Sequence, residues 1–196
     1  ELATAFQKLG AQVHVVEMLD RPLTRYDEDM ARVVHERAKE VGVQFTFNSR
    51  ATGYSVEDGL ITVDIESENG DTQALTANKA LVAVGREPQT ASVEPEAAGV
   101  AVDDEGFIQT DELGQTSIDS IYAIGDVAGE PLLAHQAMYE GQVVAEVIAG
   151  EPAALDARAV PAVVFTDPEM ATVGMTEREA TEAGFEPLVG QAPLSS

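Results

Sequence analysis

The chain has 196 residues, a length that suits one large domain or parts of several domains. Hydrophobic residues make up 44% of it, which is enough for a packed core. No apolar run approaches the ~20 residues that a membrane span needs, and no hydrophobic leader opens the chain, so the sequence predicts no membrane association. It contains no cysteine, which excludes disulfides and thiolate metal sites within these residues.

Acidic residues outnumber basic residues by 35 to 11, giving a formal net charge of −24 that is spread along the chain. Such a surface repels itself in dilute buffer, whereas at ~1 M salt the Debye length falls to ~3 Å and most of the repulsion is screened. We therefore predict a halophilic, cytoplasmic protein, with an ordinary acidic enzyme as the alternative. The same charge disfavours binding to the phosphates of nucleic acids.

The first fifty residues alternate between helix and strand patterns. The predicted elements are a helix over residues 1–9, a strand over 12–17, a helix over 27–41 and a strand over 43–47. This order fits a doubly wound parallel sheet. Because the chain begins inside a predicted helix and without methionine, we expect it to start within a larger protein.

The pattern then changes to an antiparallel meander. The predicted strands cover residues 52–56, 60–66 and 71–76, separated by the turn sequences Glu57-Asp58-Gly59 and Glu68-Asn69-Gly70. Two continuous apolar runs follow, ALVAV at residues 80–84 and IYAI at residues 121–124. Such runs are typical of buried parallel strands.

Loops and a third helix make up most of the remainder. We predict loops over residues 86–116, a helix over 135–149, a linker over 151–160 and strands over 162–166 and 170–174. Thr176 followed by Glu179 has the spacing of a capping box and predicts one more helix start.

Glu17 ends the strand over residues 12–17. In a dinucleotide-binding fold the second strand ends in an acid that accepts hydrogen bonds from the adenosine ribose and repels the extra phosphate of NADP. The matching glycine fingerprint would lie about 20 residues earlier, upstream of residue 1. The alternative, an acid at an exposed strand end, stays open on this evidence.

Gly125 and Asp126 follow the second apolar run and precede a helix start. A glycine allows close approach of a ligand to the backbone, and Asp126 can accept hydrogen bonds from a bound polyol. The free N–H groups of the helix start at Leu132–His135 favour negative charge, such as that of a reduced flavin. A plain strand–turn–helix joint is the equally balanced alternative.

Other candidate groups carry weaker signals. Gly85-Arg86-Glu87-Pro88 is either a plain turn or a hinge between domains. The histidines His14, His35 and His135 show no metal-ligand spacing, so we predict no metal site. Asp167 and Glu169 flank Pro168, where a solvated turn is favoured over a catalytic carboxylate pair.

Three motifs in order resemble the pyridine nucleotide–disulfide oxidoreductases: ALVAVGREPQT, IYAIGDVAGEPLLAHQAMYEG and VPAVVFTDPEMATVGMTEREA. The LLAHQAMYEG segment is most similar to the dihydrolipoyl dehydrogenase branch. The resemblance implies an α/β fold with parts of two doubly wound, Rossmann-like nucleotide-binding domains and the start of an α+β dimerisation domain. It places the end of the NAD domain at residues 1–86, the returning part of the FAD domain at 87–155 and the interface domain at 156–196.

The resemblance also assigns site residues. On the NAD side these are Glu1, beside the nicotinamide, Glu17, on the adenosine ribose, and Ala51 and Gly85, which touch NAD. On the FAD side they are Asp126, on the ribityl–phosphate region, and Leu132, Leu133, Ala134 and His135, at the isoalloxazine.

The resemblance implies an enzyme that passes electrons from a dihydrolipoyl group through a redox disulfide and FAD to NAD. It also implies a homodimer that serves a lipoyl-bearing subunit of a 2-oxoacid dehydrogenase or related complex. The first FAD motif, the redox cysteines, the NAD glycine motif and the His–Glu dyad are absent, so we expect no catalytic residue in this chain. The alternatives are another FAD/NAD(P) disulfide reductase, such as a mercuric reductase, or a non-catalytic nucleotide-binding flavoprotein.

Overall fold

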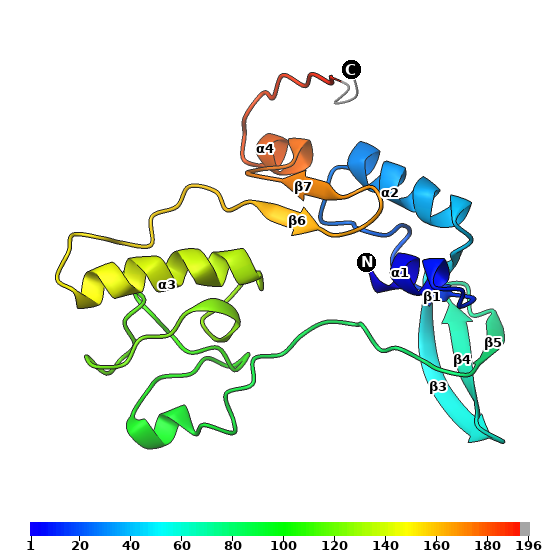
Figure 1. The fold of residues 1–196 in the computed structure, drawn as a ribbon, viewed down its shortest axis with the longest axis horizontal. Coiled ribbons are helices and arrows are strands. Elements are labelled where there is room, and N and C mark those ends of the chain that lie inside the picture. The colour runs from blue at the N-terminus through cyan, green and yellow to red at the C-terminus, as the bar shows by residue number, and fades with distance from the viewer. Residues whose placement is uncertain (193–196) are drawn as a thin grey trace. The chain divides into compact units, whose positions relative to one another are not determined.

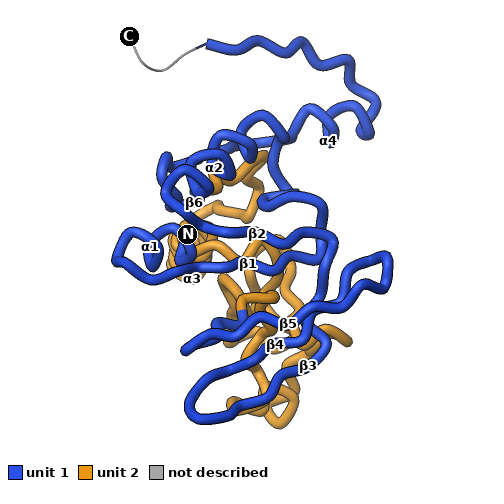
Figure 2. Tube along the Cα trace, turned by 90° about the vertical axis from the view of Figure 1, so that its right-hand side faces the viewer, with its two compact units in different colours: residues 1–82, 163–196 blue, residues 83–162 orange. Residues whose placement is uncertain are grey.

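The computed structural model describes residues 1–192 (Figure 1), and the chain divides into two compact units. The first unit contains residues 1–82 and residues from 163 onward, and the second contains residues 83–162, blue and orange in Figure 2. The three-part domain division suggested by the sequence stays a prediction. None of the helices within residues 1–192 is long and apolar enough to cross a membrane.

A parallel strand pair with its helices forms the first part of unit 1. Strand β1 (His14–Val16) pairs with β2 (Gln44–Thr46) in parallel, and helices α1 (Leu2–Lys8) and α2 (Glu28–Glu40) precede β1 and connect the two strands. This is the predicted helix–strand–helix–strand order, and the α/β class is confirmed. A connection through a helix is what a parallel pair requires, because a tight turn cannot join parallel strands.

Helix α2 forms where charge and apolar spacing agree. Its first turn carries Glu28 and Asp29 and its last turn Arg37 and Lys39, each of the sign that the helix dipole favours at that end. Ala31, Val34 and Ala38 recur at helical spacing and are buried. Gly42 follows the helix at a φ of +105°, a conformation that suits glycine at a helix end.

His35, on α2, lies against two aromatic rings at β2, one within the strand and one directly after it. Its ring centroid is 4.8 Å from that of Phe45 and 5.2 Å from that of Phe47, in edge-to-face geometry with both. The buried Nε2 atom has no hydrogen-bond partner. Burial first, and then the positive charge of Lys39, lower the pKa of His35, while Glu36 acts in the opposite direction.

We expect the full-length protein to lose stability as the pH falls below about 6.5, the ordinary pKa of histidine. Because the folded-state pKa is lowered, the unfolded state binds more protons below that pH, and stability therefore rises with pH through this window. The melting temperature should therefore be lower at pH 5.5 than at pH 7.5, which lie about one unit below and above that value. His35→Phe should flatten this slope, and His14→Gln, at an exposed histidine on β1, should not. A His35→Phe protein with the original slope would contradict the assignment.

A three-stranded antiparallel meander completes the first part of unit 1, as predicted. Its strands are β3 (Ser49–Glu57), β4 (Leu60–Ser67) and β5 (Thr72–Ala77), with β4 in the centre. Asp58 and Gly59 form the two-residue turn between β3 and β4 at φ of +50° and +79°, the left-handed pair that a tight hairpin needs. Ile65, in the central strand, is only 1% exposed.

The remaining part of unit 1 packs on α2. Strand β6 (Ala162–Val164), whose first residue is the last of unit 2, pairs with β7 (Met170–Thr172), and Val164 and Met170 form a buried cluster with Val34. Helix α4 (Glu177–Glu182) starts with the predicted capping box, in which Thr176 and Glu179 each bind the other's backbone N–H. The Glu177 N–H also donates to Asp27 at 3.1 Å, which ties α4 to the start of α2.

Unit 2 contains little regular structure apart from helix α3 (Ala134–Ile148). Two short 3₁₀ turns, η1 (Pro95–Ala98) and η2 (Gly125–Val127), lie in its loops. Two aspartates organise these loops: one oxygen of Asp103 accepts from two backbone N–H groups, and one oxygen of Asp111 does the same. Asx turns of this kind allow a long loop to keep a fixed path without sheet pairing.

Two strand predictions were wrong. Residues 80–84 form no strand, and Val84 is 94% exposed; residues 121–124 make only an isolated bridge between Tyr122 and Gln115. In the doubly wound fold that the sequence motifs imply, the fourth strand pairs with the first, and β1 and β2 take the second and third places. No strand within residues 1–192 holds the first place, so the run at 80–84 has no neighbour with which to form hydrogen bonds. The same lack of a parallel neighbour among the described strands applies to residues 121–124.

Candidate functional site

Glu17 directly follows β1 and is fixed at three points. Its N–H donates to the Thr46 carbonyl at 2.9 Å, and its own carbonyl accepts from the Ser49 N–H at 3.1 Å. Its carboxylate oxygen Oε1 accepts from the Leu19 N–H at 3.0 Å. The half-buried side chain is therefore held at the carboxyl end of a parallel strand, which is where open α/β sheets bind their ligands.

Arg21, the nearest cation to Glu17 in the sequence, is committed to its own loop. Nη1 donates to the carbonyls of Pro22 and Leu23, at 3.4 and 3.1 Å, and Nη2 donates to those of Thr24 and Tyr26, at the same two distances. Leu23 has a φ of +58°, which turns the loop around the guanidinium. A guanidinium that satisfies four carbonyls is not available to bind a phosphate without opening this loop.

Ala51 is the predicted NAD residue that lies nearest to Glu17 through a chain of bonded neighbours. Ser49, bonded to Glu17, begins β3, and Ala51 lies two residues further along that strand, at the point where the pairing register shifts. Glu1 lies elsewhere in unit 1, where its Oε1 accepts from the Phe165 N–H at 2.7 Å. Gly85 belongs to unit 2 and adopts a φ of +147°. The NAD assignments of these residues stay predictions.

A second group of predicted residues gathers in unit 2 around Asp126, in η2. Arg86 Nη1 donates to Asp126 Oδ2 at 2.7 Å and to the Leu132 carbonyl at 3.2 Å. Because the ion pair is exposed, it adds little to the free energy of folding, and its main effect is to orient the Asp126 carboxylate. Arg86 thus joins two predicted FAD residues. The sequence placed it only in a segment that was either a plain turn or a hinge.

Glu140, on α3, holds the same turn from the helix. Its Oε2 accepts from the Gly125 N–H at 2.6 Å, and its Oε1 accepts from Gln136 Nε2 at 2.5 Å. Gly125 adopts a φ of +70°, and a Cβ there would lie 2.8 Å from that of Ala137. Sequence reasoning missed Glu140; the spacing of four between Gln136 and Glu140, directly after the predicted helix start, was the available signal.

The start of α3 has no side-chain cap. Leu133 occupies the N-cap position without a side-chain cap, and the first turn carries no acidic residue. The first N–H groups of a helix have no intrahelical partners and carry partial positive charge. His135 contacts the Pro161 carbonyl through Nε2. The roles assigned to Leu132, Leu133, Ala134 and His135 stay predictions.

Asp167 is engaged in unit 1. Its carboxylate lies 2.5 Å from Lys8 Nζ and 3.4 Å from Arg37 Nε. The hydrogen bond from Lys8 is the main cause that lowers the pKa of Asp167. A carboxylate held in its charged form by two cations is a poor proton donor near neutral pH, which favours a structural role for this loop.

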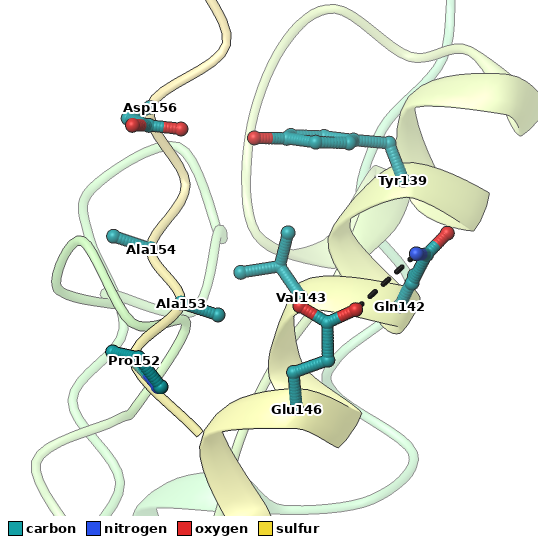
Figure 3. Close-up of a pocket in the computed structure, with 8 residues that line it drawn as sticks. All are labelled: Tyr139, Gln142, Val143, Glu146, Pro152, Ala153, Ala154 and Asp156. Carbon is teal, nitrogen blue, oxygen red and sulfur yellow. Dashed lines mark hydrogen bonds between the residues drawn. The ribbon is translucent and has the colours of Figure 1, made fainter.

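A cavity of about 310 Å³ lies in unit 2 beside α3 (Figure 3). Its lining residues are Tyr139, Gln142, Val143, Glu146, Pro152, Ala153, Ala154 and Asp156. None of the predicted site residues lines it. Among residues 1–192 there is also no cluster of three or more His, Cys, Asp or Glu side chains that could hold a metal ion.

Comparison with known families decides the identity of the chain. The family model described as pyridine nucleotide-disulphide oxidoreductase matches residues 1–141, and the one described as its dimerisation domain matches residues 160–196. The chain belongs to this family. The resemblance drawn from the three sequence motifs is confirmed.

Curated relatives within the family include dihydrolipoyl dehydrogenases of salt-loving archaea. The chain is 53% identical over 99% of its length to a dihydrolipoyl dehydrogenase of Haloferax volcanii, and 52% identical over 99% to dihydrolipoyl dehydrogenase 2 of Haloarcula marismortui. It spans 41% of the length of each relative. These relatives support the halophilic origin predicted from the charge of −24.

Solved structures of the family agree with the fold. The HOCl-induced flavoprotein disulfide reductase RclA from Escherichia coli matches with a TM-score of 0.83 at 32% identity. The match covers 93% of this chain and 41% of that protein. The residues described here therefore adopt the fold of the corresponding part of a longer flavoprotein reductase.

Proposed function

We propose that the protein containing this chain is a dihydrolipoyl dehydrogenase, with FAD and NAD as its cofactors. The observation that carries the proposal is the identity of 49–53% to dihydrolipoyl dehydrogenases across at least 99% of the chain. In the proposed reaction a protein-bound dihydrolipoyl group and NAD⁺ give a lipoyl disulfide, NADH and one proton. The bound flavin supplies the electron relay between thiols and nicotinamide.

The residues of unit 2 fit a flavin. Asp126 offers carboxylate oxygen to a polyol hydroxyl, since among residues 1–192 only its Oδ2 accepts a hydrogen bond, from Arg86. Gly125 leaves the backbone of the turn without a side chain, and the uncapped start of α3 can face a negatively charged group. These features support roles for Asp126 on the ribityl chain and for Leu132, Leu133, Ala134 and His135 along the isoalloxazine.

The residues of unit 1 fit the adenosine half of NAD. Glu17 sits at a strand end with one oxygen committed to the Leu19 N–H, which orients the carboxylate to accept from ribose hydroxyls. By the family resemblance Glu1 lies beside the nicotinamide, and Ala51 and Gly85 contact NAD. The chain's own task is to bind and orient both cofactors, since it has no cysteine to exchange electrons with a dithiol.

We further propose that the protein is a cytoplasmic homodimer that accepts lipoyl groups from a subunit of a 2-oxoacid dehydrogenase or related complex. The match of residues 160–196 to a dimerisation domain supports the dimer. The identity of the lipoyl-bearing partner rests on the dihydrolipoyl dehydrogenase relatives alone.

The test is turnover of dihydrolipoamide with NAD by the full-length protein, purified in high KCl. We expect bound FAD and NADH production by the full-length protein, and no turnover above the buffer blank by residues 1–196 alone, which lack thiols. Turnover by the isolated segment would contradict this division of labour. A full-length protein that binds FAD but reduces mercuric ion or a coenzyme disulfide in place of oxidising dihydrolipoamide would overturn the proposed substrate.

A further inference from the structure

The turn that carries Asp126 is held in place at Gly125, which contacts helix α3 through a hydrogen bond and through close packing. The Gly125 N–H points at Glu140 Oε2, 2.6 Å away, which is short for an N–H donor and typical of a charge-assisted bond. The Cα of Gly125 also lies so close to Ala137 that a Cβ would be 2.8 Å from the Ala137 methyl. Contact with the helix at two points fixes both the position and the direction of the backbone that enters Asp126.

Glu140 is itself held in place. Gln136, one helical turn earlier, donates from Nε2 to the other oxygen of the carboxylate at 2.5 Å. Both oxygens therefore have a donor, and Glu140 is partly buried. A carboxylate with both oxygens engaged has one favoured orientation, so it can act as a fixed acceptor for the Gly125 N–H.

Arg86 also binds this turn, through the carboxylate of Asp126 and the carbonyl of Leu132. The two residues bind different atoms: Glu140 binds the backbone N–H of Gly125, and Arg86 binds the side chain of Asp126. The bond from Glu140 has the larger effect on the position of the Asp126 carboxylate, because a shift of Gly125 moves the Cα of Asp126 and the carboxylate with it.

We infer that Glu140 is a positioning residue for flavin binding, which acts on the cofactor through Gly125 and Asp126 without touching it. The inference rests on the proposed function, because it requires Asp126 to bind the flavin. It predicts that Glu140 contributes to FAD affinity only while the Asp126 carboxylate is present.

The same helix provides a matched control. Gln142 donates to Glu146 at 3.3 Å (Figure 3), which repeats the spacing of Gln136 and Glu140 further along the helix. The Gly125 N–H of η2 donates to Glu140 and not to Glu146. Glu146→Ala removes the same charge and the same kind of intrahelical pair as Glu140→Ala. A purely helix-stabilising role would make the two substitutions equivalent.

The experiment measures the dissociation constant of FAD for the full-length protein at fixed high KCl. Loss of a charge-assisted hydrogen bond corresponds to about tenfold or more, so Asp126→Ala should raise this constant by at least about tenfold. Glu140→Ala should raise it by about tenfold, Glu140→Gln, which keeps an acceptor oxygen, by less than about threefold, and Glu146→Ala by less than about twofold. In the Asp126→Ala background, Glu140→Ala should add less than about twofold.

The outcomes separate the two levels of the argument. If Asp126→Ala leaves FAD affinity unchanged, the proposed flavin site fails, and the inference about Glu140 fails with it. If Asp126→Ala weakens binding but Glu140→Ala does not, or adds its full effect in the Asp126→Ala background, the positioning role alone is overturned. The melting temperature of each apoprotein shows whether a variant is folded, and the Gln variant at residue 140 keeps the test decisive if the Ala variant does not fold.

Discussion

The full-length protein should melt about 10 °C higher in about 2 M KCl than in about 0.1 M KCl. The chain carries 35 acids and 11 bases, so 24 carboxylates have no cation of the same chain to balance them. Their mutual repulsion opposes the compact state, and it is screened once the Debye length falls to ~3 Å near ~1 M salt. A shift of this size requires relief of several kcal/mol, because about 1 kcal/mol moves the melting temperature by roughly 2–4 °C in proteins of 150–250 residues and by less in longer ones, and this chain spans 41% of the length of its curated relatives.

Salt also weakens the favourable ion pairs, but this loss of attraction is smaller than the relief of repulsion between carboxylates. Lys8–Asp167 and Arg50–Glu66, two ion pairs of the first unit, lie at the surface with side chains at least 35% exposed. Pairs of this kind contribute only about 0–1 kcal/mol each. With so few bases, the attraction lost in salt is smaller than the repulsion relieved.

The test is a melting curve at a series of KCl concentrations, repeated with MgCl₂ at matched ionic strength. If screening is the cause, the two series should coincide, and most of the gain should occur below about 1 M. A triple variant of exposed acids in the meander turns, Glu57→Gln, Asp58→Asn and Glu68→Gln, should melt higher than the parent at low salt and show a smaller salt effect. A melting temperature that is flat or falls with salt would contradict the screening argument.

The first half of unit 1 could be predicted because its signals are local. Residues 27–41 show an apolar face at helical spacing with charges that suit each end, and Asp58-Gly59 has the backbone preference that a tight hairpin requires. The capping box at Thr176 and Glu179 is equally local. In each case the residues that decide the element lie within a few positions of one another.

The runs at 80–84 and 121–124 could not be predicted correctly because strand formation depends on distant partners. An apolar run becomes a buried strand only when neighbouring strands supply hydrogen bonds and cover its faces. Among residues 1–192 no strand does so, and Val82 and Val84 remain exposed at 78% and 94%. The composition of an apolar run does not indicate whether neighbouring strands are present to pair with it.

The site shows the same division. The position of Glu17 follows from the end of a β-branched run, and that of Asp126 from the Gly-Asp pair before a helix. Arg86 reaches Asp126 across 40 residues and Glu140 reaches Gly125 across 15 residues, so no local pattern shows these contacts, although the spacing of Gln136 and Glu140 marks that pair within the helix. What the sequence could not show is which side chains hold the predicted residues in place.

Glu17→Gln should lower the preference of the full-length protein for NAD over NADP by about tenfold. Two unit charges about 5 Å apart repel by about 3 kcal/mol at an effective dielectric constant near 20, and solvent reduces this for a half-buried carboxylate. The glutamine keeps an acceptor oxygen for the ribose hydroxyl but no longer repels a 2′-phosphate. The change should therefore appear mainly as improved catalytic efficiency with NADP, with a smaller loss for NAD.

The geometry of Arg21 makes this expectation sharper than the sequence could. An arginine four residues after the acid could have offset the repulsion, since arginine suits phosphate. Its guanidinium instead donates to the carbonyls of Pro22, Leu23, Thr24 and Tyr26. If the guanidinium moved to a phosphate, these four carbonyl oxygens would lose their donor. Arg21→Ala in the Glu17→Gln background should therefore leave the gain with NADP in place, although it should lower stability.

The measurement is the ratio of kcat/KM for NAD to that for NADP, at one fixed KCl concentration and at the lowest salt in which the protein stays folded. Asp20→Asn is the matched control, because it removes the same charge from an exposed position three residues beyond Glu17 and should change the ratio by less than about twofold. If Asp20→Asn and Glu17→Gln shift the ratio equally, only the overall charge of the loop matters. If neither shifts it, Glu17 does not face the ribose, and the adenosine site lies away from the carboxyl end of β1.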